Sequence, residues 1–120
     1  MRAVIILKNI SNIDKKYIDR VRTSFKEVMD TGLGKGFMIS NSSGKTGTSE
    51  TFYDSDNDGI IDTPTISNAF VGYFPSDNPR FSIALTFPNI MRLNGKSEGR
   101  SYANKRITRR ISEVLKELYG

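Results

Sequence analysis

The chain contains a run of four residues that could bind a carboxylate, Lys45-Thr46-Gly47-Thr48. The lysine offers a cation for a terminal carboxylate or a proton path to a neighbouring hydroxyl, and a desolvated lysine is suited to proton transfer. The two threonine hydroxyls can hydrogen-bond the same carboxylate. Gly47 has no Cβ, so a ligand backbone can lie edge-on against a strand there. The alternative is an ordinary edge strand whose lysine faces solvent.

A second polar run, from Asp54 to Asp62, is typical of a cation-binding loop. Four aspartates stand at positions 1, 3, 5 and 9 of an EF-type calcium loop, and a glycine stands at position 6. Position 12, which requires a bidentate glutamate, is a threonine, and no helix is expected before the loop. The sequence therefore predicts weak Ca²⁺ binding or a solvated turn that is rich in Asp. The four candidate ligands are Asp54, Asp56, Asp58 and Asp62.

The composition excludes several kinds of chemistry. The 120 residues include no cysteine and no histidine, which excludes disulfides, thiol catalysis and histidine-based acid–base or metal sites. The net charge of +5 is compatible with nucleic acid, an anionic surface or a carboxylate-bearing substrate. The longest apolar run, Ala3 to Leu7, is too short to span a membrane, so no membrane contact by this segment is expected.

A basic flank near the C-terminus is the argument for nucleic-acid binding. Lys105, Arg106, Arg109 and Arg110 supply its charge. These residues alternate with apolar positions, as on any amphipathic surface helix, and no helix-turn-helix pattern or aromatic platform accompanies them. We therefore expect no nucleic-acid partner.

The predicted elements place the Lys-Thr-Gly-Thr run on the first strand of a small sheet. Residues 2–9 have the pattern of a short buried strand, and apolar helical spacing predicts a helix at about 14–31 that Gly32 and Gly34 end. Strands are predicted at 43–53, 67–74 and 81–87, with a turn at 75–79. A final helix follows, capped by Ser101, and its predicted buried stripe consists of Ile107, Ile111, Val114, Leu115 and Leu118.

The predicted class is α+β, a three-stranded antiparallel sheet flanked by two helices. The order of these segments resembles the C-terminal part of the transpeptidase domain of class B penicillin-binding proteins from Gram-positive bacteria. Lys-Thr-Gly-Thr is one signature of that family and of serine β-lactamases, beside S-x-x-K and S-x-N. AFVGYFPSDNPRFSIALTFPNI and then SYANKRITRRISEVL follow it in the family's order. The resemblance covers roughly residues 12–118.

The resemblance implies a parent D,D-transpeptidase that acts on peptidoglycan stem peptides and that β-lactams acylate. It implies catalytic roles for Lys45 and Thr48 and substrate binding by Lys45, Thr46, Gly47 and Thr48. The backbone N–H of Thr48 would be one oxyanion-hole donor, a contribution of about 3 kcal/mol. The parent would lie on the extracytoplasmic face of the cell membrane, tethered by an N-terminal helix outside this chain. No cofactor is implied.

The family's serine nucleophile is not expected within these residues. Ser42-Ser43-Gly44-Lys45 matches S-x-x-K, but its lysine belongs to the strand run, so it cannot form one helical turn. Ser76-Asp77-Asn78 and Ser55-Asp56-Asn57 match S-D-N only in predicted turns. We therefore expect residues 1–120 to be a single partial domain without turnover of its own.

A partial domain would also leave surface uncovered. The family's sheet has five strands, of which three are expected here, so strand edges and an apolar face would lack their partners. The isolated chain is expected to self-associate or to be marginally stable.

Overall fold

The computed structural model of this chain describes residues 12–90 and 102–119. The elements are α1 (Lys15–Asp30), β1 (Ser43–Tyr53), β2 (Thr63–Phe74), β3 (Phe81–Ile90) and α2 (Tyr102–Tyr119). Two helices and a three-stranded antiparallel sheet among the described residues confirm the predicted α+β class. The strand predicted at 2–9 and the cap predicted at Ser101 lie outside the described residues.

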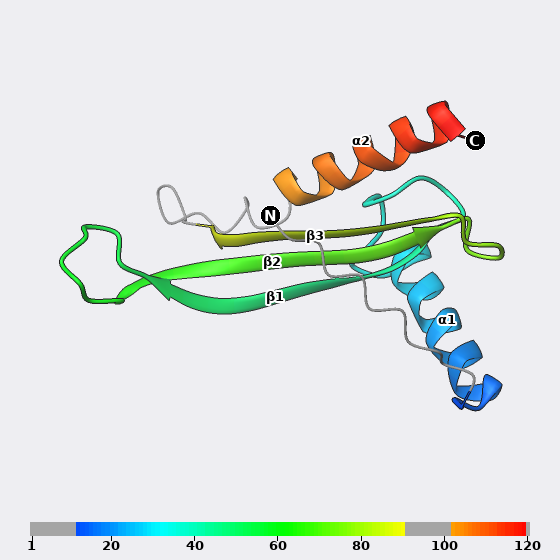
Figure 1. The fold of residues 1–120 in the computed structure, drawn as a ribbon, viewed down its shortest axis with the longest axis horizontal. Coiled ribbons are helices and arrows are strands. Elements are labelled where there is room, and N and C mark those ends of the chain that lie inside the picture. The colour runs from blue at the N-terminus through cyan, green and yellow to red at the C-terminus, as the bar shows by residue number, and fades with distance from the viewer. Residues whose placement is uncertain (1–11, 91–101, 120) are drawn as a thin grey trace.

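The sheet has the order β1-β2-β3, with both pairs antiparallel (Figure 1). Thr46 lies opposite Phe70, and Thr48 lies opposite Asn68. β2 begins four residues before the predicted start at 67 because its pairing with β1 continues to Tyr53 and Thr63. A register shift between residues 66 and 68 interrupts the pairing of β2 with β3.

The core is built around Phe70, which is fully buried. A Cβ on Gly44 or on Gly72 would lie 2.8 Å from the Phe70 ring, so the absence of side chains at these two positions makes room for it. The Phe37 ring stacks on Phe70 with centroids 5.0 Å apart. The buried apolar cluster consists of Met29, Phe37, Met38, Phe70, Phe74 and Ile83.

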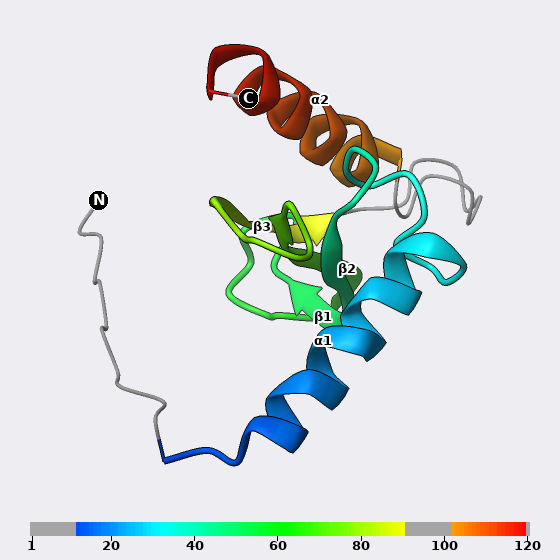
Figure 2. The same ribbon diagram turned by 90° about the vertical axis from the view of Figure 1, so that its right-hand side faces the viewer.

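α1 begins and ends close to the predicted positions. Asp14 is its N-cap, and the Asp14 carboxylate accepts a hydrogen bond from the Lys16 backbone N–H at 3.0 Å. The helix contacts β1, whereas α2 contacts β2 and β3, so the two helices lie on opposite sides of the sheet (Figures 1 and 2). Only Met29 of α1 is buried, and Tyr17 and Val21 are more than half exposed.

The stripe predicted to be buried on α2 is partly wrong. Ile107 and Leu118 are exposed, although Ile111 and Leu115 pack against the core as expected. The buried positions are instead polar: Asn104, Thr108 and Ser112.

Hydrogen bonds explain why the polar residues of α2, rather than the whole apolar stripe, face the rest of the domain. The Ser112 hydroxyl accepts from the Ile39 backbone N–H at 3.2 Å, and the Arg109 guanidinium donates to the Met38 carbonyl at 3.0 Å. Within the helix, the Thr108 hydroxyl donates to the Asn104 side-chain oxygen at 3.1 Å. Small polar side chains let α2 approach the segment before β1 closely enough to make these bonds.

We predict that Phe70→Ala lowers the free energy of unfolding by about 3–5 kcal/mol, because it empties the centre of the core. Phe52→Ala is the matched control, since the Phe52 side chain is 58% exposed on β1. Urea denaturation followed by circular dichroism would measure both. Equal losses for the two variants would contradict the assignment of the core.

Candidate functional site

The Lys-Thr-Gly-Thr run lies on β1, an edge strand among the described residues. An edge strand directs every second N–H and C=O group away from its partner strand, where an extended peptide can add. Lys45 is exposed, and its ammonium donates to the Thr46 carbonyl at 2.6 Å. The Lys45 ammonium is therefore accessible to solvent beside β1.

Three of the four residues line a small hollow of about 150 Å³. The Thr48 hydroxyl, which lines it, donates to the Asn68 side-chain oxygen at 3.1 Å. Sequence reasoning missed Asn68 and Asn104, which bring amide groups from β2 and α2. The strand register would have indicated Asn68, because it lies directly opposite Thr48. The lining consists of Leu33, Phe37, Thr46, Gly47, Thr48, Asn68, Ala69 and Asn104.

Strand alternation separates the lysine from the two threonines. Thr46 and Thr48 lie opposite Phe70 and Asn68, both of which are buried. Lys45 lies opposite the exposed Val71, on the other face of the sheet. The hollow therefore gathers hydroxyl and amide groups, and Lys45 is not among its lining residues. A ligand could therefore contact both the Lys45 ammonium and the threonine hydroxyls only if it lay along the edge of β1.

The serines that match the family's signature strings are accounted for by the fold. Ser42 is 3% exposed, and its hydroxyl donates to the Ile39 carbonyl at 2.7 Å. Ser43 is the first residue of β1, and its hydroxyl bonds to that of Ser76. The S-x-x-K string is thus extended rather than helical. The two S-D-N strings lie in the β1–β2 loop and the β2–β3 turn, as predicted.

The acidic loop between β1 and β2 brings three of its four predicted ligands together. Carboxylate oxygens of Asp54, Asp56 and Asp58 lie within 4.8 Å of one another. Asp54 also accepts from the backbone N–H groups of Asp58 and Gly59, at 3.2 and 2.9 Å. These hydrogen bonds are sufficient to hold the loop in its turn without a bound ion. Ca²⁺ binding stays a prediction, which a calorimetric titration would decide.

Carboxylates on the same helix pair with part of the basic flank of α2. Arg109 donates to Glu113 at 2.7 Å, and Arg110 lies 3.5 Å from Glu113 and 4.0 Å from Glu117. The hydrogen bond from Arg109 lowers the pKa of Glu113 below its usual range. Two of the four cations are thus engaged within α2.

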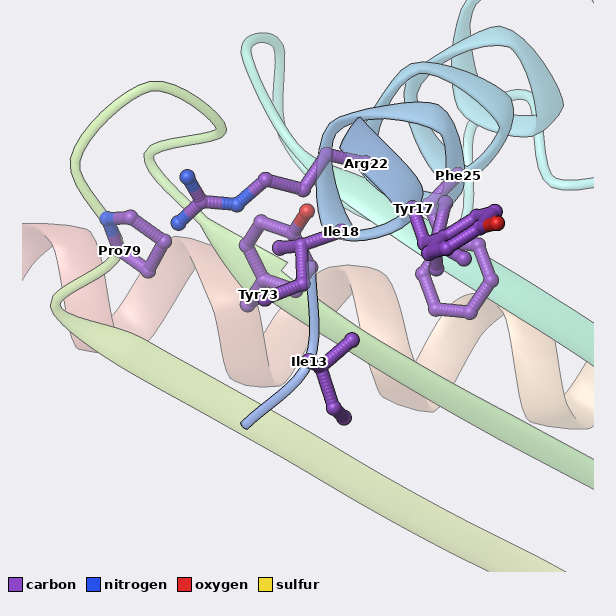
Figure 3. Close-up of a pocket in the computed structure, with 8 residues that line it drawn as sticks. Ile13, Tyr17, Ile18, Arg22, Phe25, Tyr73 and Pro79 are labelled. Carbon is purple, nitrogen blue, oxygen red and sulfur yellow. The ribbon is translucent and has the colours of Figure 1, made fainter. Parts of the chain in front are cut away.

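A larger, apolar hollow of about 510 Å³ lies between α1 and the end of β2 (Figure 3). The half-exposed Tyr17 and Val21 line it on the α1 side, and Tyr73 and Pro79 close the other side. The Tyr73 hydroxyl is buried and has no hydrogen-bond partner among the described residues. The sequence indicated the apolar stripe of α1 but not its exposure.

Comparison with known proteins assigns the chain to a family. The family model for the penicillin-binding protein transpeptidase domain matches residues 5–113. The chain therefore belongs to this family, and the predicted resemblance is confirmed.

Two relatives come from Bacillus subtilis (strain 168). Penicillin-binding protein H is 34% identical over 85 residues, which are 71% of this chain. Penicillin-binding protein 2A is 33% identical over 84 residues, which are 66% of this chain. The matched parts are 12% of each relative's length. None of the described helices is long and apolar enough to cross a membrane.

We predict that Gly47→Ala changes the free energy of unfolding by less than about 1 kcal/mol, whereas Gly44→Ala lowers it by about 1–3 kcal/mol. A Cβ on Gly47 would meet Ala69 at an ordinary 3.7 Å, but one on Gly44 would lie 2.7 Å from the Val71 carbonyl oxygen. Urea denaturation would test this. A large loss for Gly47→Ala would mean that internal packing requires the glycine.

Proposed function

We propose that this chain supplies the substrate-binding strand of a penicillin-binding D,D-transpeptidase. Residues 45–48 bind the C-terminal carboxylate of a peptidoglycan stem peptide, and β-lactams present the corresponding group to the same strand. The observation that carries the proposal is the location of Lys-Thr-Gly-Thr on an edge of the described sheet, in a chain of this family.

The local geometry supports this role in two ways. Lys45 is exposed, so its ammonium can leave the Thr46 carbonyl and pair with a ligand carboxylate. Thr46 and Thr48 line a hollow that also contains amide groups, so hydroxyl donors stand beside the strand edge. A peptide backbone that adds to this edge would run past Gly47. Internal packing does not require a glycine at this position, because a Cβ there would make only an ordinary contact with Ala69.

The remaining chemistry of the whole protein is part of the same proposal. A serine hydroxyl attacks the carbonyl between two D-alanines, the terminal D-alanine leaves, and an amine of a second stem peptide takes the acyl group. The Thr48 N–H stabilises the developing oxyanion, and Lys45 and Thr48 are the catalytic residues of this strand. The whole protein acts at the extracytoplasmic face of the membrane. The serine strings in this chain lack the geometry for that attack, so the chain alone has no turnover.

The binding role predicts a contrast between two ligands. An N-acetyl-D-alanyl-D-alanine dipeptide should shift the amide resonances of residues 45–48 in an NMR titration, whereas its C-terminal amide should bind several-fold more weakly because it lacks the carboxylate. Lys45→Gln should reduce the affinity by a similar factor. Lys35→Gln is the control, because Lys35 is exposed and outside this site. Equal affinity for acid and amide would remove the proposed carboxylate contact.

The same proposal predicts no covalent reaction of this chain with penicillin. Incubation with a fluorescent penicillin should give no labelled band after denaturing electrophoresis, because Ser42 is buried and its hydroxyl is bound to a carbonyl. A band that Ser42→Ala abolished would show that this serine is the nucleophile after all.

A further inference from the structure

A basic pocket with an aromatic floor lies at the end of the sheet where β1 begins, and none of residues 45–48 lines it. Its volume is about 330 Å³. Arg80 comes from the β2–β3 turn and Lys116 from the last turn of α2, and neither forms an ion pair with any residue that the structure describes. Phe74 and Phe81 also line the pocket, with ring centroids 5.1 Å apart, and the Arg80 guanidinium lies 5.6 Å from the Phe81 centroid. Such a pocket suits an apolar side chain flanked by carboxylates.

Hydrogen bonds hold the β2–β3 side of this pocket in place. The Arg80 backbone N–H donates to the Phe74 carbonyl at 3.0 Å, and the Ser76 N–H donates to the Asn41 carbonyl at 2.8 Å. The Asn41 amide donates to Asp77 at 3.0 Å. This last bond lowers the pKa of Asp77 below its usual range. Like any exposed aspartate, Asp77 is charged at neutral pH. Arg80 and Lys116 still leave the pocket with a surplus of positive charge.

The chemistry that this pocket would recognise occurs elsewhere on the same chain. The β1–β2 loop carries four aspartates, and next to them Ile60 and Ile61 are 59% and 68% exposed. Backbone N–H groups bonded to Asp54 and Asp58 hold this loop in a turn. The loop therefore presents two apolar side chains beside a group of carboxylates.

The two features cannot meet within one molecule. The molecule is 50 Å long, and Figure 1 shows the β1–β2 loop at one end of the long axis, with the β2–β3 turn and the C-terminal end of α2 at the other. Only the loop of another copy can therefore reach the pocket. The sequence predicts self-association through unpaired strand edges and an uncovered apolar face, and charge complementarity between loop and pocket specifies which surfaces would meet.

We propose that copies of this chain associate head to tail, with the acidic β1–β2 loop of one copy docked in the basic pocket of the next. Ile60 or Ile61 packs on Phe74 and Phe81, and the loop carboxylates pair with Arg80 and Lys116. A head-to-tail contact uses different surfaces on the two partners, so it continues into a ring or an open chain rather than stopping at a dimer.

Sedimentation velocity of the full chain over a range of concentrations tests this proposal. In 50 mM salt the average mass should rise past that of a dimer, and 500 mM salt should weaken association about tenfold because the paired charges are screened. Arg80→Glu with Lys116→Glu should abolish association. Asp56→Lys with Asp62→Lys should do the same, and it leaves the hydrogen bonds of Asp54 and Asp58 in place.

Mixing the two double variants gives the decisive result. Each keeps one intact end, so an equimolar mixture should associate although neither variant does so alone. Arg20→Glu with Lys35→Glu, an equal change of charge at exposed positions outside the pocket, should leave association unchanged. A chain that stays monomeric at every concentration would overturn the proposal. Association that strengthens with salt, or that ignores both double variants, would also overturn it and would point to apolar surface such as the α1 hollow.

Discussion

The packing of one ring, Phe70, determines how the rest of this structure is arranged. The ring lies where Gly44 of β1 and Gly72 of β2 leave space, and Phe37 stacks on it from the segment before β1. Because side chains alternate along a strand, placing Phe70 inward also places Thr46 and Thr48 toward the α2 side and Lys45 away from it. The orientation of the candidate site thus follows from a core contact.

This dependence explains what the sequence could predict. The element order, the limits of β1 and the position of α1 followed from local patterns, because glycines, caps and apolar periodicity are read within a few residues. The separation of Lys45 from the two threonines was not predicted, since all three side chains were expected to bind one carboxylate. Alternation along a strand is local, but the inward face is chosen by Phe70, which lies 24 positions from Thr46 in the sequence.

The parts that sequence reasoning missed depend on long-range hydrogen bonds. The apolar residues of α2 suggested a stripe that included Ile107 and Leu118, yet Ser112 and Arg109 bond to the backbone at residues 38 and 39 and rotate the helix away from it. Those long-range bonds leave no periodic signal. The asparagines of the small hollow were missed because Asn68 and Asn104 come from elements distant from β1 in the sequence, and finding Asn68 requires the register of β1 with β2.

The polar attachment of α2 has a consequence for how this domain opens. Hydrogen bonds fix a position precisely but contribute little net free energy, whereas the buried sheet residues gain most from leaving water. α2 is therefore attached to the sheet less firmly than the strands are to one another, and its amide protons would exchange with deuterium before those of β2. Detachment of α2 would open the side of the small hollow that Asn104 lines, while the hydrogen bonds between the strands stayed intact.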